Sequence, residues 1–112
     1  MPSEEIKKYD VAYYAGGKMA NSYPYRAIIG LRRDDGSLIG AAYFHRNPEA
    51  MPDADSESPS GYVYCHYRSE DFPQVLDLLR NEQPVYVRYV GGIWNIASIQ
   101  TSLEPIGEGE QP

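Results

Sequence analysis

The stretch YRAIIGLRRDDGSLIGAAYFH, residues 25–45, carries the clearest structural signal in the chain. Two largely apolar runs, residues 25–32 and 37–45, flank Asp34-Asp35-Gly36. Aspartate and glycine tolerate the positive φ angles of tight turns, so this pattern predicts a β-hairpin. Gly30 and Gly40 interrupt the two runs and indicate bulges, bends or close packing at those points.

Working outward from this hairpin, alternating residues predict further strands. The expected strands are residues 9–15, 61–68, 85–90 and 93–100. Gly91-Gly92 predicts a tight two-residue turn between the last two of them. The pattern of residues 69–81 predicts one amphipathic helix, with Ser69 as its N-cap and an apolar stripe at helical spacing. The stripe consists of Phe72, Val75, Leu76 and Leu79.

The order of these elements is β-ββ-β-α-ββ, which predicts an α+β fold. We expect a mostly antiparallel, curved sheet of five to six strands with one amphipathic helix packed on one face. The 112 residues form a single domain, residues 1–112, with an ordered body over about 9–103. Residues 48–60 are predicted to be a mobile acidic loop, and residues 104–112 a disordered acidic tail.

Charge is distributed unevenly along the chain. The net charge is −6, yet residues 48–60 alone hold four acids and no base, and residues 104–112 hold three acids. The remaining body, residues 11–47 and 61–102, carries eight bases against six acids. The overall acidity disfavours wholesale binding to nucleic acid or to an anionic membrane, while the body itself is faintly basic.

Cysteine content and the N-terminal sequence bear on the compartment. Cys65 is the single cysteine, so no internal disulfide can form, and no paired Cys/His spacing indicates zinc. The chain starts without an apolar signal segment and contains no apolar run of membrane-spanning length. We therefore expect a cytoplasmic protein without cofactor or membrane association.

The strands place polar and aromatic residues on a common face, opposite the apolar residues. Tyr67 and Tyr89 fall on the apolar side, which is expected to face the helix. The predicted binding face contains tyrosines, arginines and two histidines but no acid. Its residues are Arg26, Arg32, Tyr43, His45, Tyr62, Tyr64, His66, Arg68, Tyr86 and Arg88.

Two functions suit such a face. Tyrosine and arginine are enriched in protein interfaces, and open sheet edges favour pairing between chains, so the first is protein–protein interaction or self-association as a homodimer. Aromatic rings beside bases can also stack single-stranded nucleobases and hold their phosphates, which is the alternative. An ordinary half-exposed sheet shows the same alternation without any partner.

Signals for catalysis are weak. Cys65 and His66 are adjacent on one strand, so their side chains leave opposite faces and cannot pair; Cys65 is expected to be a core residue. His45 and His66 can be neighbours if their strands pair, but two histidines without a carboxylate make a poor metal site. Trp94 either anchors the core, which we favour, or forms an interface. We therefore predict a non-enzymatic binding module without metal.

Overall fold

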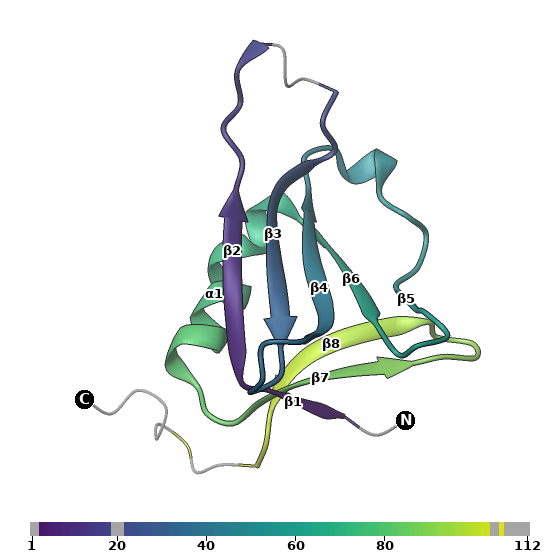
Figure 1. Cartoon of the computed structure of the whole chain (residues 1–112). Coiled ribbons are helices and arrows are strands. Elements are labelled where there is room, and N and C mark those ends of the chain that lie inside the picture. The colour runs from purple at the N-terminus through teal and green to yellow at the C-terminus, as the bar shows by residue number, and fades with distance from the viewer. Residues whose placement is uncertain (1–2, 19–21, 104–105, 107–112) are drawn as a thin grey trace.

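The computed structural model describes residues 3–18, 22–103 and 106, and within these residues the strands form two sheets (Figure 1). The smaller sheet has the order β1-β7-β8, with β1 at Glu4–Ile6, β7 at Val85–Val90 and β8 at Ile96–Thr101. The larger sheet, in spatial order, contains β2 (Lys8–Tyr13), β3 (Tyr25–Arg32), β4 (Leu38–His45), β6 (Val63–Arg68) and β5 (Ser56–Glu57). All neighbouring strands are antiparallel except β4 and β6, which are parallel.

The α+β class is confirmed: both sheets are mostly antiparallel, and one helix packs against them. A 3₁₀ turn, η3 at Ser69–Asp71, leads directly into α1 at Phe72–Asn81, so the predicted helix is also confirmed. The expected N-cap at Ser69 is wrong. Ser69 lies inside the 3₁₀ turn, and the residues before the two helical segments, Arg68 and Asp71, make no side-chain capping bond.

The core lies between the inner face of the larger sheet, the helix and the smaller sheet. Phe44, Ile29 and Leu31 are fully buried there, and Phe72 of α1 packs edge-on against Phe44 at 5.2 Å between ring centroids. Tyr67 stacks on Phe44, and Tyr89 packs against the same core. The prediction that these two tyrosines belong to the apolar side is therefore confirmed.

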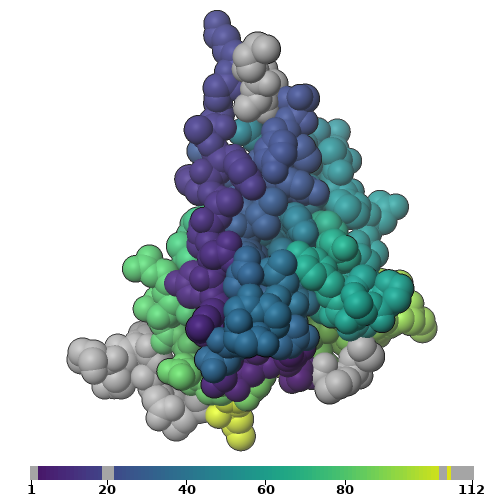
Figure 2. Space-filling view, in the orientation of Figure 1, coloured from purple at the N-terminus to yellow at the C-terminus, as the bar shows by residue number. Residues whose placement is uncertain are grey.

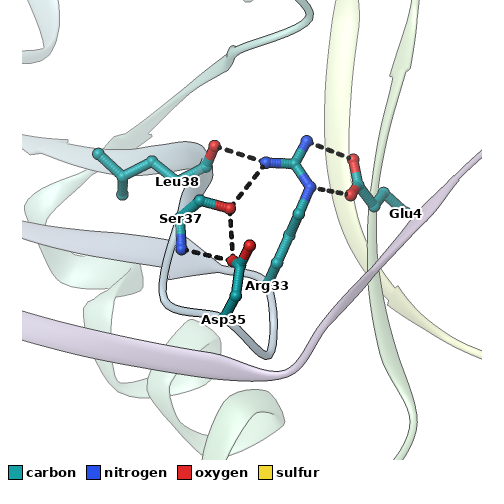
Figure 3. A network of polar contacts seen from close by, with 5 residues as sticks. All are labelled: Glu4, Arg33, Asp35, Ser37 and Leu38. Carbon is teal, nitrogen blue, oxygen red and sulfur yellow. Dashed lines mark hydrogen bonds and ion pairs between the residues drawn. The ribbon is translucent and has the colours of Figure 1, made fainter.

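The predicted hairpin of residues 25–45 is present, with Gly36 at φ 90° in its turn. The turn is braced by Asp35, which accepts hydrogen bonds from the Ser37 amide and hydroxyl at 2.9 and 2.7 Å (Figure 3). These two bonds, the hydroxyl first, lower the pKa of Asp35. Arg33 reaches from the same turn to Glu4 of β1 through both carboxylate oxygens, at 2.5 and 3.2 Å, and so joins the two sheets.

Strand β1 precedes residue 9, where the ordered body was expected to begin. Its three residues are too few to produce a recognisable pattern: Glu4 and Glu5 are both half-buried, and Ile6 is buried. Among the described residues, no helix has the length and apolar character needed to cross a membrane. The tail predicted to be disordered, residues 104–112, lies outside the described residues except for Ile106.

The parallel pairing of β4 with β6 requires a long connection, which runs through residues 46–62. It contains a 3₁₀ turn, η2 at Pro48–Ala50, and the short strand β5. Asp55 in this connection joins the two sheets: its carboxylate accepts the backbone N–H of His66 in β6 and of Ala97 in β8, both at 2.8 Å. The mobility of the acidic segment stays a prediction, but it supplies this specific contact.

The second hairpin differs from its prediction. Strand β8 begins at Ile96, so β7 and β8 are connected by residues 91–95 and not by Gly91-Gly92 alone. Gly92 and Asn95 both take positive φ angles, 72° and 48°. The favoured core position of Trp94 is wrong, because this longer loop carries the side chain outward and leaves it 74% exposed.

Candidate functional site

An aromatic surface covers the outer face of the larger sheet, on the side away from α1. We call it the aromatic face and define it by Tyr25, Tyr43, His45, Tyr62, Tyr64 and His66. Figure 2 views the molecule from this side: residues of β2, β3, β4 and β6 fill the front, and the green of α1 shows only at the margin. The larger sheet therefore has one face in the core and one free of the helix.

Tyr43 lies at the centre of this face, and its ring contacts its neighbours in three directions. Ring centroids are 5.2 Å from Tyr25, 6.1 Å from Tyr64 and 5.8 Å from His66. Such separations are within the range in which aromatic pairs attract one another beyond simple burial. The rings are half-buried, and His45 is almost fully buried. The face is therefore a contiguous layer and not a set of separate side chains.

Two side-chain hydrogen bonds fix this layer across the parallel strand pair. The Tyr43 and Tyr62 hydroxyls are 3.1 Å apart, and His45 Nε2 is 3.0 Å from His66 Nδ1. The strand register explains the second contact, because His66 lies opposite Tyr43 and two residues before Arg68, the partner of His45, so both imidazoles lie on the same face. The expectation that the two histidines are neighbours is confirmed.

Burial controls the ionisation of the face. It raises the pKa of Tyr43, and the hydrogen bond with Tyr62 raises it further. It lowers the pKa of His45, with a smaller contribution from His66, and it lowers the pKa of His66 against the opposing effect of Asp55. These pKa shifts favour the uncharged forms of Tyr43, His45 and His66 at neutral pH.

Tyr25 belongs to the face although alternation alone places it with the apolar residues. A register shift between Tyr25 and Ala27 pairs Tyr25 with His45 and Ala27 with Phe44, so the strand gains one residue. A β-bulge of this kind reverses the parity of every residue before it. Tyr23 and Tyr14 extend the row of rings, at 5.7 Å from Tyr25 to Tyr23 and 4.9 Å from Tyr23 to Tyr14. The hydrogen bond with Tyr14 raises the pKa of Tyr23.

The same bulge removes Arg26 from the predicted face. Its guanidinium lies 4.6 Å from the centre of the Tyr13 ring and donates to the Tyr14 carbonyl. Tyr13 itself stacks on Phe72, so Arg26 lies toward the helix side of the sheet. There it lines an open hollow together with Arg46 and Ser69.

The other arginines are also distributed differently from the prediction. Arg32 is paired with Asp10 of β2 at 2.7 Å and donates to the Gly36 carbonyl. Tyr86 and Arg88 lie on β7, in the smaller sheet, and do not join the tyrosines of β4 and β6. Arg68 is exposed at the end of β6. Of the ten predicted residues, the structure brings together Tyr43, His45, Tyr62, Tyr64 and His66.

The expectation of an acid-free face is wrong. Asp10 pairs with Gly30 in register, and its carboxylate occupies the space over that glycine, where an added Cβ would lie 2.5 Å from Asp10 Oδ1. Its charge neutralises Arg32 locally. The surface therefore contains aromatic rings with little net positive charge.

Two observations concern the chemistry of the cysteine and the grouping of metal-ligating side chains. Cys65 is buried on the inner face, and burial raises the pKa of its thiol to about 12, which suits a core residue and not a nucleophile. The core position of Cys65 is confirmed. Within the described ranges, no three His, Cys, Asp or Glu side chains are grouped as metal ligands.

Comparisons with known protein families, curated protein sequences and solved structures find no match to the chain.

Proposed function

We propose that this chain is a small, non-enzymatic, cytoplasmic binding module whose aromatic face binds a protein partner. The observation that carries the proposal is the contiguous layer of half-exposed rings around Tyr43, on the side of the sheet away from α1. Tyrosine provides large contact area at a small entropic cost, and it is enriched in protein interfaces. The hydrogen bonds within the layer hold the rings in place before a partner arrives.

Single-stranded nucleic acid is the alternative ligand, because exposed rings can stack on bases. Electrostatics argue against it. Binding of phosphate groups needs lysine or arginine side chains near the rings. Arg26, however, points toward the helix side, and Arg32 is paired with Asp10. Arg68 lies opposite His45 in the strand register, and Arg46 lines a hollow together with His45 and Tyr23. Self-association through the same face is a further form of protein binding, in which the partner is a second copy.

The test uses Tyr64→Thr, which removes a ring from the face and keeps a residue that favours strands. Its matched control is Tyr86→Thr, because Tyr86 is also half-buried on a strand but belongs to the other sheet. Binders are selected from a displayed library of random peptides on the unmodified protein. We expect them to bind Tyr86→Thr normally and Tyr64→Thr at least about tenfold more weakly.

Three outcomes count against the proposal or change its partner. Equal binding to both variants would place the contact elsewhere. Sedimentation that shows a dimer lost in Tyr64→Thr would identify a second copy as the partner. Salt-sensitive binding of labelled single-stranded DNA or RNA, weakened by Tyr64→Thr, would favour the nucleic-acid alternative.

A further inference from the structure

The tip of the β7–β8 hairpin exposes more apolar surface than its short length would suggest. Ile93 is 91% exposed, Trp94 74% and Ile96 55%. Scattered apolar residues are ordinary on protein surfaces, but three within four positions form a patch. Trp94 and Ile96 also line a cavity of about 250 Å³ together with Met51 and Pro52 of the acidic segment.

The backbone between these apolar residues is held from two sides. Asn95 takes a left-handed conformation with φ 48°, and its side-chain oxygen accepts a hydrogen bond from the Tyr89 hydroxyl at 3.0 Å. Its backbone carbonyl accepts the N–H of Asp55 at 3.1 Å. An anchor that is already positioned loses less conformational entropy when it binds. Trp94 is thus presented outward by a braced loop.

The surroundings of Trp94 are acidic. Asp53 and Asp55 line the cavity, whereas no lysine or arginine does so among the described residues. Asp53 is exposed, while the carboxylate of Asp55 accepts two backbone N–H groups. A negative rim attracts lysine and arginine and repels acidic peptides and anionic lipids. The face of an indole ring also binds cations favourably.

We call the cavity lined by Trp94 and Ile96 and by Met51 to Asp53 the groove. We propose that the groove binds a polypeptide segment in which a lysine or arginine lies next to an apolar residue. The apolar residue packs on Trp94, and the cation pairs with Asp53. The inference rests on the proposed function, because His66 belongs both to the aromatic face and to the wall of the cavity. The groove extends the aromatic face and specifies the chemistry of its partner.

The experiment selects binders from a displayed library of random peptides of about a dozen residues. Recovered sequences should combine lysine or arginine with apolar residues. Trp94→Ser and Asp53→Lys should each weaken their binding at least about tenfold. Leu103→Ser and Asp34→Lys are matched controls that change an exposed apolar residue and an exposed acid outside the groove, and they should bind normally.

A second readout uses the fact that Trp94 is the single tryptophan of the chain. Peptides without tryptophan should shift its emission to shorter wavelength on binding, since its surroundings become less polar. An unchanged emission spectrum in the presence of bound peptide would overturn the proposal. Emission that shifts with phosphatidylserine vesicles but not with peptide would overturn it in favour of a membrane surface.

The results separate this inference from the proposed function. Peptides that require Tyr64 but bind equally to wild type, Trp94→Ser and Asp53→Lys would overturn the groove and support the aromatic face. Recovered sequences without lysine or arginine would overturn the predicted partner chemistry. Failure to recover any peptide would overturn both proposals. Each variant should retain the circular dichroism spectrum of the wild type, because Trp94 and Asp53 are exposed.

Discussion

The two faces of the larger sheet are built by the same strands and differ in what their side chains pack against. On the inner face, Phe44 and Cys65 are buried by the helix and the smaller sheet. On the outer face, Tyr43 and Tyr64 gain their partial burial from rings of the same layer. Alternation within one strand thus separates residues buried in the core from residues that stay half-exposed on the outer face.

The largest expected effect tests this contrast directly. Phe44→Ala leaves a cavity at a fully buried position, so we expect the free energy of unfolding to fall by about 3–5 kcal/mol. Tyr64→Ala, on the same β4–β6 strand pair but on the outer face, should cost less than half as much. Urea unfolding followed by circular dichroism measures both. Similar losses would mean that the outer face is as much a core as the inner one.

Asp55 is the next test, because it connects β6 to the smaller sheet. Asp55→Ala removes the acceptor of two backbone N–H groups, those of His66 and Ala97. Leaving such donors unpaired should lower the free energy of unfolding by about 2–3 kcal/mol. Asp53→Ala is the control, an exposed acid in the same segment, and should change stability by no more than about 0.5 kcal/mol. Equal effects would show that water replaces the carboxylate.

Gly40 tests how closely β4 approaches β6. A Cβ at this position would lie 2.3 Å from the backbone oxygen of Val63, so Gly40→Ala forces the parallel strands apart. We expect a loss of about 1–3 kcal/mol in the free energy of unfolding. Gly17→Ala is the control, since no atom lies within 4 Å of its added Cβ, and it should be neutral or slightly stabilising. A neutral Gly40→Ala would contradict the close parallel pairing.

Local patterns were sufficient to predict much of the fold. The Asp34-Asp35-Gly36 turn and the alternation in β3, β4, β6 and β7 are short-range signals, and so is the apolar stripe of α1. The division into two sheets was not accessible, because it depends on long-range pairing. The pairing of β1 with β7 joins residues at opposite ends of the chain. Similarly, the parallel pairing of β4 and β6 depends on a connection whose composition indicated only a loop.

The site was also predicted only in part, because short-range patterns show parity within a strand but not bulges or long-range pairing. Parity within β4 and β6 correctly grouped Tyr43, His45, Tyr64 and His66, since both strands are regular. It failed at Arg26 and missed Tyr25, because a bulge adds a residue that no local pattern marks. It also failed at Tyr86 and Arg88, whose parity was correct but whose strand belongs to the other sheet. Trp94 was misplaced because the expected two-residue turn is a longer loop.

The histidine pair should make the stability of the outer face depend on pH. Burial lowers the folded-state pKa of His45 and His66 below the ordinary value of 6.5. Just below that value the unfolded chain binds more protons than the folded chain, so stability falls as the pH falls. The loss ends once the pH is below both folded-state pKa values. His45→Gln should have a flatter dependence between about pH 7 and pH 5 than wild type in urea unfolding. Parallel curves for the two proteins would contradict this.

The smallest expected effect asks whether the outer face is organised or merely solvated. The Tyr43 and Tyr62 hydroxyls are 3.1 Å apart. In a double-mutant cycle, Tyr43→Phe and Tyr62→Phe should each lower stability slightly and should share a coupling energy of about 0.5–1.5 kcal/mol. Tyr64→Phe, whose hydroxyl bonds to no described residue, should couple to neither change. A coupling near zero would mean that water serves each hydroxyl equally well. The aromatic face would then acquire its arrangement only on binding, and its affinity would have to offset that ordering.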